Sequence, residues 1–196
     1  AASAEPIRTL HHFAGTGGSL ISKIVASSPN ALLLSEFNPL SRAVANLSEL
    51  RFAPSDIVLL LRYAFREVDE QRLAAVVLAA LGELHDQCTR FGERLILRDH
   101  AHSQYCLGEA ASDALTLRQL AARIAPVRGV VSVRDPIDSF LSVHRNGWLH
   151  FRPGTIEEYA RRYLAFLDDH ADLPLFLYEH LVAAPEAVAH ELCTTL

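Results

Sequence analysis

The feature that most constrains the fold is an apolar segment that leads directly into a glycine-rich turn. Residues 7–13 form a short apolar run, and residues 14–19 follow with the sequence Ala-Gly-Thr-Gly-Gly-Ser. Residues 20–26 then carry apolar side chains at helical spacing. We therefore predict a strand, a tight turn and a helix, which is the repeating unit of a parallel α/β sheet.

The rest of the chain repeats this alternation of short strands and helices. We expect further strands at 31–34, 93–97, 127–133 and 175–178, and helices that include 69–91, 155–169 and the C-terminal segment. Residues 127–133 are the most β-branched run and are expected as a central strand, whereas 103–115 is expected as loop. The pattern predicts an α/β fold with a central parallel β-sheet flanked by helices. We expect one domain over residues 1–196, with a helical insert at about 40–91.

Composition excludes several kinds of partner. The 18 Lys and Arg residues against 23 Asp and Glu give a net charge of -5, and no dense basic run suggests nucleic acid binding. No uninterrupted apolar stretch approaches the roughly 18–20 residues of a membrane span, so we predict no membrane partner. Cys88, Cys106 and Cys193 form no CxxC pair, which favours reduced thiols and a cytoplasmic location. Homo-oligomer formation is left open.

The glycine turn predicts an anion site. Gly15, Gly17 and Gly18 allow a sharp turn that brings backbone N–H groups close to a ligand, and the following helix start favours negative charge. Thr16 and Ser19 add hydroxyl groups. The alternative is a plain connection in which Ser19 caps the helix. The turn is not a Walker A loop, because the GxxxxGK[ST] pattern is absent.

A second candidate segment follows the strand at 127–133. Arg134 stands at the carboxyl end of that strand, where open α/β sheets bind ligands. Ser142 lies in the next helix, near enough to share one phosphate with Arg134, although Arg134 could instead pair with Asp138. A third segment, Leu-Tyr-Glu-His-Leu at 177–181, includes Tyr178 and precedes Pro185.

Together the three segments resemble the nucleotide site of PAPS-dependent sulfotransferases, in a bacterial-type member. The resemblance implies a P-loop NTPase-like sulfotransferase fold and the donor 3′-phosphoadenosine 5′-phosphosulfate (PAPS), with 3′-phosphoadenosine 5′-phosphate as product. It implies that residues 15–19 hold the 5′-phosphosulfate, that Arg134 and Ser142 hold the 3′-phosphate, and that Tyr178 lies near the adenine. The implied reaction is sulfuryl transfer to a small-molecule or glycan hydroxyl, or an amine, with no metal required.

The candidate catalytic residues follow from positions where the chain matches the sulfotransferase pattern and from one position where it departs from that pattern. Many sulfotransferases carry Lys or Arg where this chain has Gly15, so we expect Arg98 to supply the missing positive charge. Arg98-Asp99-His100 resembles the Lys-Thr-His of cytosolic members, which makes His100 one candidate base. Glu36 is the other, because glycan-type and some bacterial members place a carboxylate shortly after the first helix. We favour Glu36, and the two could act together.

Two alternatives to this function remain. The chain could be a nucleotide or small-molecule kinase on a P-loop fold, although the Walker A lysine is missing. It could also be a non-catalytic nucleotide-binding protein, which the absence of the loop cation favours. His100 and His102 form a His-x-His pair, but two ligands do not make a metal site, and we predict no metal.

Overall fold

The computed structural model describes residues 4–41, 56–62, 64, 66, 68–107 and 115–196. Its core is a five-stranded, all-parallel sheet in the order β2-β3-β1-β4-β5. The strands are β1 (Ile7–His12), β2 (Ala31–Phe37), β3 (Arg94–Asp99), β4 (Val127–Val133) and β5 (Leu175–Leu177). All five lie where the sequence predicts strands, and the predicted α/β class is confirmed.

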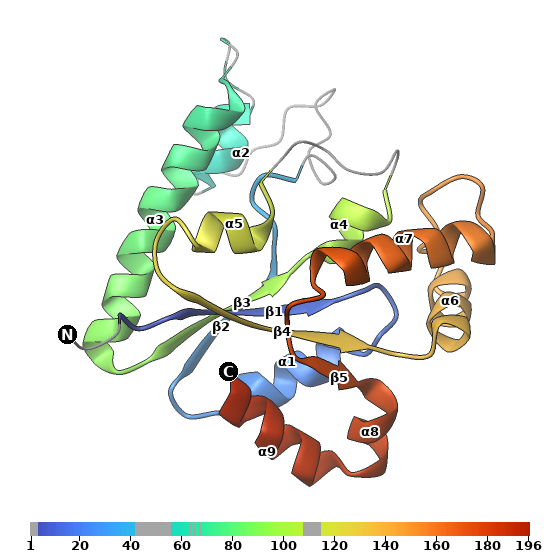
Figure 1. Cartoon of the computed structure of the whole chain (residues 1–196). Helices are drawn as coiled ribbons and strands as arrows, with labels where there is room; N and C mark the ends of the chain where they lie inside the picture. The colour runs from blue at the N-terminus through green and yellow to red at the C-terminus, as the bar shows by residue number, and fades with distance from the viewer. Residues whose placement is uncertain (1–3, 42–55, 63, 65, 67, 108–114) are drawn as a thin grey trace.

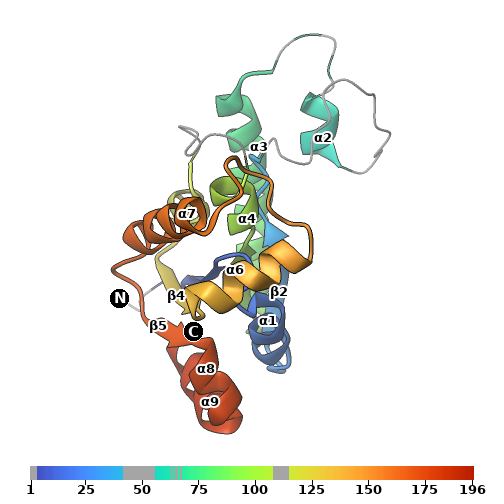
Figure 2. The ribbon, with the colours of Figure 1, turned by 90° about the vertical axis from the view of Figure 1, so that its right-hand side faces the viewer.

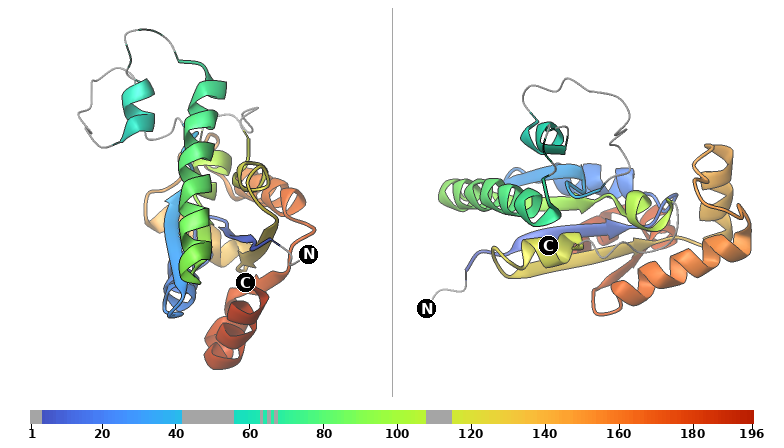
Figure 3. Two further views of the ribbon diagram at one scale, coloured as in Figure 1. Left: turned by 90° about the vertical axis from the view of Figure 1, so that its left-hand side faces the viewer. Right: turned by 90° about the horizontal axis from the view of Figure 1, so that it is seen from above.

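Helices cover both faces of this sheet (Figure 1). They are α1 (Gly18–Ala26), α2 (Ile57–Arg62), α3 (Glu70–Phe91), α4 (Ala101–Tyr105), α5 (Leu117–Ala121), α6 (Pro136–Arg145), α7 (Ile156–Asp169), α8 (Tyr178–Ala183) and α9 (Pro185–Thr195). Helices α3, α5 and α7 lie over one face, as the view from above in Figure 3 shows, and α1, α8 and α9 lie on the other. Helix α6 crosses the end of the sheet that faces the viewer in Figure 2.

Strand β1 is the middle strand, and all six of its residues are buried. The β-branched strand β4 is interior, as expected, with β1 on one side and β5 on the other. Alternate side chains feed separate cores on the two faces. Leu10, Ile96 and Val130 pack toward α1 and α9, whereas Leu95 and Leu97 pack toward α3 and α5.

Local sequence signals explain several helix boundaries. Thr155 caps α7 by accepting a hydrogen bond from the Glu158 N–H, and Gly92 ends α3 in the left-handed conformation. Two expectations need correction. Helix α4 occupies the first part of the stretch expected as loop, and the predicted C-terminal helix is split at Ala184, because Pro185 starts α9. In the predicted insert, α2 and α3 are helical, while residues 42–55 lie outside the described residues.

The structure also bears on the predictions about the cysteines and about membrane-spanning segments. Cys88, Cys106 and Cys193 are all unpaired, and the first two are buried. Within the described ranges, no helix is both long and apolar enough to cross a membrane.

Aromatic side chains fill the core beneath the carboxyl end of β1. Phe13 is fully buried, stacks on Tyr163 at 4.8 Å and meets Phe166 at 5.4 Å between ring centroids. Tyr159 packs edge-on against Phe13 at 5.2 Å. Since Phe13 is followed directly by the glycine turn, this cluster fixes the position from which the turn starts.

Replacement of Phe166 by alanine tests the importance of this cluster. Phe166 is fully buried, and removal of its ring should lower the free energy of unfolding by about 3–5 kcal/mol. Urea denaturation measures the change. Leu164→Ala is the matched control, because Leu164 lies two residues earlier in α7 but is 60% exposed; an equal loss in both variants would contradict the assignment.

Candidate functional site

The glycine turn connects β1 to α1 and leaves backbone donors unpaired. Gly15 and Gly17 have φ values of 81° and 83°, in the left-handed region that glycine tolerates best. Gly17 is the N-cap of α1 and no side chain caps this helix. Among the described residues, the N–H groups of Gly17, Gly18 and Ser19 donate to no backbone carbonyl. The turn therefore presents three N–H groups at a helix N-terminus, which suits an anion.

Thr16 has a different role from the one its sequence position suggests. Its side chain is buried, and its hydroxyl donates a hydrogen bond to the Phe13 carbonyl at 2.7 Å. The Thr16 N–H points to the same oxygen at 3.3 Å. Thr16 thus shapes the turn from inside, and its contact with a phosphate stays a prediction. Ser19 is exposed.

Two glycines of the turn touch the other two candidate segments. A Cβ at Gly15 would lie 2.7 Å from the Ser139 carbonyl oxygen and 3.0 Å from Val143 in α6. A Cβ at Gly17 would overlap the ring of Tyr178, the first residue of α8. The structure therefore brings together three segments that are far apart in the sequence.

The contact at Gly15 also explains why this chain lacks a cation in the turn. Helix α6 packs so closely that no side chain fits at position 15, and the positive φ disfavours any residue other than glycine. The hydroxyl of Tyr159 reinforces this packing, because it donates to the Ala14 carbonyl at 3.0 Å and contacts the Ser139 hydroxyl at 2.6 Å.

Arg134 lies beside Tyr178 at the end of β4. Its guanidinium carbon is 5.0 Å from the centroid of the Tyr178 ring, and a terminal nitrogen is 3.4 Å from an Asp138 carboxylate oxygen. The predicted alternative pairing with Asp138 is thus present, but it is long. The Arg134 Nε atom is buried and has no hydrogen-bond partner among the described residues. A buried donor without a partner requires an explanation.

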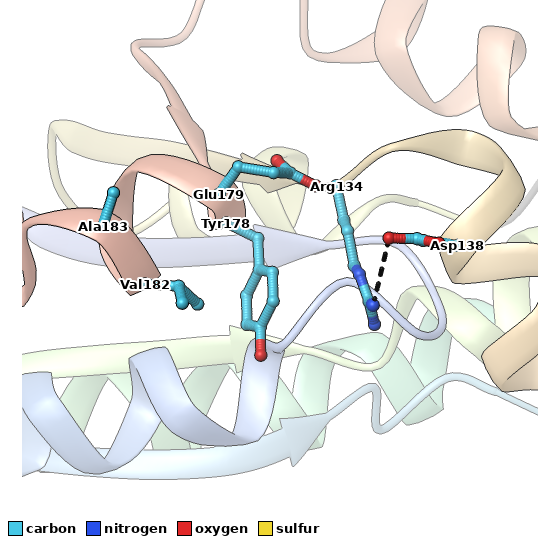
Figure 4. Close-up of a pocket in the computed structure, with 6 residues that line it drawn as sticks. All are labelled: Arg134, Asp138, Tyr178, Glu179, Val182 and Ala183. Carbon is cyan, nitrogen blue, oxygen red and sulfur yellow. Dashed lines mark hydrogen bonds and ion pairs between the residues drawn. The ribbon is translucent and has the colours of Figure 1, made fainter.

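A pocket of about 250 Å³ lies at these side chains, lined by Arg134, Asp138, Tyr178, Glu179, Val182 and Ala183 (Figure 4). The Tyr178 ring extends from the start of α8 toward the glycine turn, and Arg134 reaches down beside it. Glu179 accepts a hydrogen bond from the Asp135 N–H at 2.9 Å, which holds α8 against the start of α6. Sequence reasoning missed Glu179 as a residue that positions the pocket, although it is part of the Tyr-Glu segment.

Ser142 lies on α6, four residues after Asp138 and therefore on the same helical face. That face begins beside Arg134, which is consistent with the predicted pairing of Arg134 and Ser142. Ser142 does not line the pocket described above. Its assignment as a phosphate ligand stays a prediction.

The candidate bases gather at a distortion near the end of β2. The register of β2 against β3 shifts between Leu34 and Phe37, and Glu36 has a φ of 56°. A left-handed conformation is costly for glutamate, and such strain concentrates at functional sites. The bulge directs the Glu36 carboxylate to Arg98, 2.5 Å away, and its second oxygen lies 3.6 Å from His100 Nε2. The three predicted catalytic residues therefore form one cluster.

Arg98 is buried and held at three nitrogens. Besides Glu36, it donates to the Ser35 hydroxyl at 2.9 Å and, through Nε, to His12 Nε2 at 2.7 Å. Burial and the neighbouring guanidinium lower the pKa of His12 to about 4, so this ring is neutral and accepts the bond. Burial also lowers the pKa of Arg98, while Glu36 opposes that effect.

His12 joins this cluster to the glycine turn. Its ring lies directly against Gly18, where a Cβ would overlap it. Sequence reasoning missed His12, even though it ends the strand just before the turn. A titratable residue at the end of the strand that leads into a glycine turn is the signal that could have identified it.

Near His100, two other histidines form a hydrogen-bonded pair. His102 Nε2 is 2.9 Å from His150 Nδ1, and burial with two neighbouring histidines lowers the pKa of His102 to about 4. His100 lies farther off, with its ring centroid 6.3 Å from that of His102.

Comparison with known proteins supports the fold. No protein-family model and no curated protein match the chain. The structure is similar to that of a sulfotransferase from Alicyclobacillus acidocaldarius, with a TM-score of 0.53 and 16% identity over 98% of this chain and 81% of that one. An uncharacterized protein from Eubacterium ventriosum matches at a TM-score of 0.37 and 16% identity, over 84% and 74% of the two chains, which is too distant to support an argument. The chain thus has a sulfotransferase-like α/β fold.

The neutral state of His12 predicts how stability depends on pH. Unfolded histidine binds a proton below about pH 6.5, whereas folded His12 resists protonation down to about pH 4. The free energy of unfolding should therefore fall as the pH drops from 7 to 4, with His12 contributing about 3 kcal/mol of the loss. Urea titrations at several pH values measure it, and His12→Gln should flatten the decline. His190→Gln, at an exposed site, is the control and should leave the decline unchanged; equal slopes in all three proteins would contradict the prediction.

Proposed function

We propose that the protein is a sulfotransferase that uses PAPS and transfers its sulfuryl group to a hydroxyl, or an amine, of a small molecule or glycan. One observation carries the proposal: the glycine turn is in contact with α6 at Gly15 and with Tyr178 at Gly17. The three segments that resemble the sulfotransferase nucleotide site are thus adjacent in space. The sulfotransferase-like fold supports the same class of activity.

The residues present suit a nucleotide that carries phosphates at both ends of its ribose. Unpaired N–H groups at Gly17, Gly18 and Ser19 would hold the 5′ side, on a helix start that favours negative charge. The orphaned Nε of Arg134 suits the 3′-phosphate. The ring of Tyr178 offers a flat apolar surface to the adenine. When bound, PAPS supplies the sulfuryl group.

We assign the removal of the acceptor's proton to the cluster at the end of β2. Glu36 would take the proton, while Arg98 holds the carboxylate and His100 lies next to its second oxygen. His100 is the alternative base. His12 lies between Arg98 and the turn: it accepts a hydrogen bond from Arg98, and its ring packs against Gly18. We assign to Arg98 the positive charge that position 15 cannot carry.

Calorimetry with two nucleotides tests the nucleotide assignment. A salt-bridged 3′-phosphate should make 3′-phosphoadenosine 5′-phosphate bind about 10- to 100-fold more tightly than AMP. Arg134→Gln should remove this preference and leave the affinity for AMP nearly unchanged. Arg128→Gln is the matched control, because Arg128 is an exposed residue near the opposite end of the same strand. Equal binding of the two nucleotides by the unmodified protein would refute the proposal, and magnesium-dependent ATP binding in its place would favour a kinase.

Turnover measurements test the base. With PAPS and an active hydroxyl acceptor, Glu36→Gln should lower kcat by about 10²- to 10⁴-fold if Glu36 accepts the proton. His100→Gln should have the larger effect if His100 is the base. Glu93→Gln makes the same chemical change at an exposed residue just before β3 and should be harmless.

Two results would contradict the catalytic part. Full turnover in both the Glu36 and the His100 variants would show that neither is the base. Tight binding of 3′-phosphoadenosine 5′-phosphate without turnover of any acceptor in a broad hydroxyl and amine library would identify a non-catalytic nucleotide-binding protein.

A further inference from the structure

The pocket at Arg134 carries more negative than positive charge. Its lining includes one guanidinium, that of Arg134, and two carboxylates, those of Asp138 and Glu179. A carboxylate close to a bound phosphate repels it. This lining therefore opposes the 3′-phosphate that we assign to Arg134, unless each carboxylate is held in some other way.

The two carboxylates of the lining differ in what else they contact. Glu179 accepts a hydrogen bond from the Asp135 N–H at 2.9 Å. The Asp135 carboxylate in turn accepts from the N–H groups of Ile137 and Asp138, at 2.9 Å and 3.1 Å, and so caps α6. Glu179 thus helps to fix the start of α6. The Asp138 carboxylate accepts no backbone hydrogen bond among the described residues, and its partner there is Arg134.

Asp138 faces one particular edge of the Arg134 guanidinium. Its Oδ2 atom is 3.4 Å from Arg134 Nη2, along the dashed line in Figure 4. Nη2 is the terminal nitrogen on the same edge of the guanidinium as Nε. The Nε atom is closed to solvent and has no partner in the described part of the chain. One donor of this edge is therefore covered, and the other faces a carboxylate.

This edge is one that a phosphate can use. Arginine binds phosphate most strongly through two parallel N–H···O bonds, and Nε and Nη2 offer such a pair. To form both bonds, a phosphate must displace the Asp138 carboxylate from Nη2 and shift the guanidinium until Nε is accessible. Side-chain exposures of 58% for Asp138 and 26% for Arg134 leave the pair open to such an exchange. Asp138 and a phosphate thus compete for one edge of Arg134.

We propose that Asp138 limits the affinity of the site by competing with the 3′-phosphate for Arg134. This inference rests on the proposed function. The ion pair holds Arg134 until a ligand with an anion at this position displaces the carboxylate, and the loss of the pair opposes binding. Asp138 acts through Arg134 and is a positioning residue.

Calorimetry with the nearly isosteric Asp138→Asn tests the competition. This variant should bind 3′-phosphoadenosine 5′-phosphate about 3- to 10-fold more tightly, because no ion pair has to be broken and one repulsive charge is gone. AMP has no 3′-phosphate, so its affinity should change by less than about twofold. Asp86→Asn is the matched control, because Asp86 is 73% exposed, lies in α3 and does not line the pocket. It should leave both affinities unchanged.

A double variant tests whether Asp138 acts through Arg134. With Arg134→Gln already present, Asp138→Asn should give little further gain, because no guanidinium remains to compete for. In the single Asp138→Asn variant, the gain should also shrink as the salt concentration rises from about 0.05 to 0.5 M, since the pair is exposed enough to be screened.

Three outcomes would overturn the proposal. Unchanged affinity for 3′-phosphoadenosine 5′-phosphate in Asp138→Asn would show that the carboxylate does not compete. An equal gain with and without Arg134 would show that Asp138 acts as a general charge. A gain that does not respond to salt would show that the substitution changes the structure instead. Each of these leaves the proposed function intact as long as the unmodified protein prefers 3′-phosphoadenosine 5′-phosphate to AMP; without that preference, the proposed function and this inference are both refuted.

Discussion

The close packing of α6 and α8 against the glycine turn is the contact on which the candidate site depends. Gly15 meets the backbone of α6 and Gly17 meets the Tyr178 ring, and neither contact leaves room for a side chain. The turn takes its position from Phe13, which is buried among aromatic residues of α7. The same contacts that exclude a cation from position 15 therefore bring Arg134 and Tyr178 to the turn.

Arg98 of β3 is linked to the turn through His12. Arg98 is fixed by Ser35, Glu36 and the neutral ring of His12, and that ring in turn packs on Gly18. A buried, neutral histidine is a rigid acceptor that holds the guanidinium without adding a competing charge. Glu36, which pairs with Arg98, has a left-handed conformation. Such local strain persists only where the surrounding structure enforces it.

The sequence was sufficient to predict the sheet, because the strands are short segments that alternate with longer segments of helical spacing. It also singled out Glu36, Arg98 and His100, which form one cluster in the structure. The contact between Arg134 and Tyr178 was not predicted, and the expected sharing of a phosphate by Arg134 and Ser142 stays a prediction. What it could not predict depends on packing between distant elements. The inward bond of the Thr16 hydroxyl and the neutral state of His12 both require the folded neighbours.

The most direct test of the central claim is a crystal structure with 3′-phosphoadenosine 5′-phosphate. The 5′-phosphate should lie within about 2.7–3.2 Å of N–H groups at Gly17, Gly18 or Ser19, the 3′-phosphate at Arg134, and the adenine on Tyr178. A nucleotide bound elsewhere, or one that touches the turn while its 3′-phosphate makes no contact with Arg134, would contradict a single site built from these three segments.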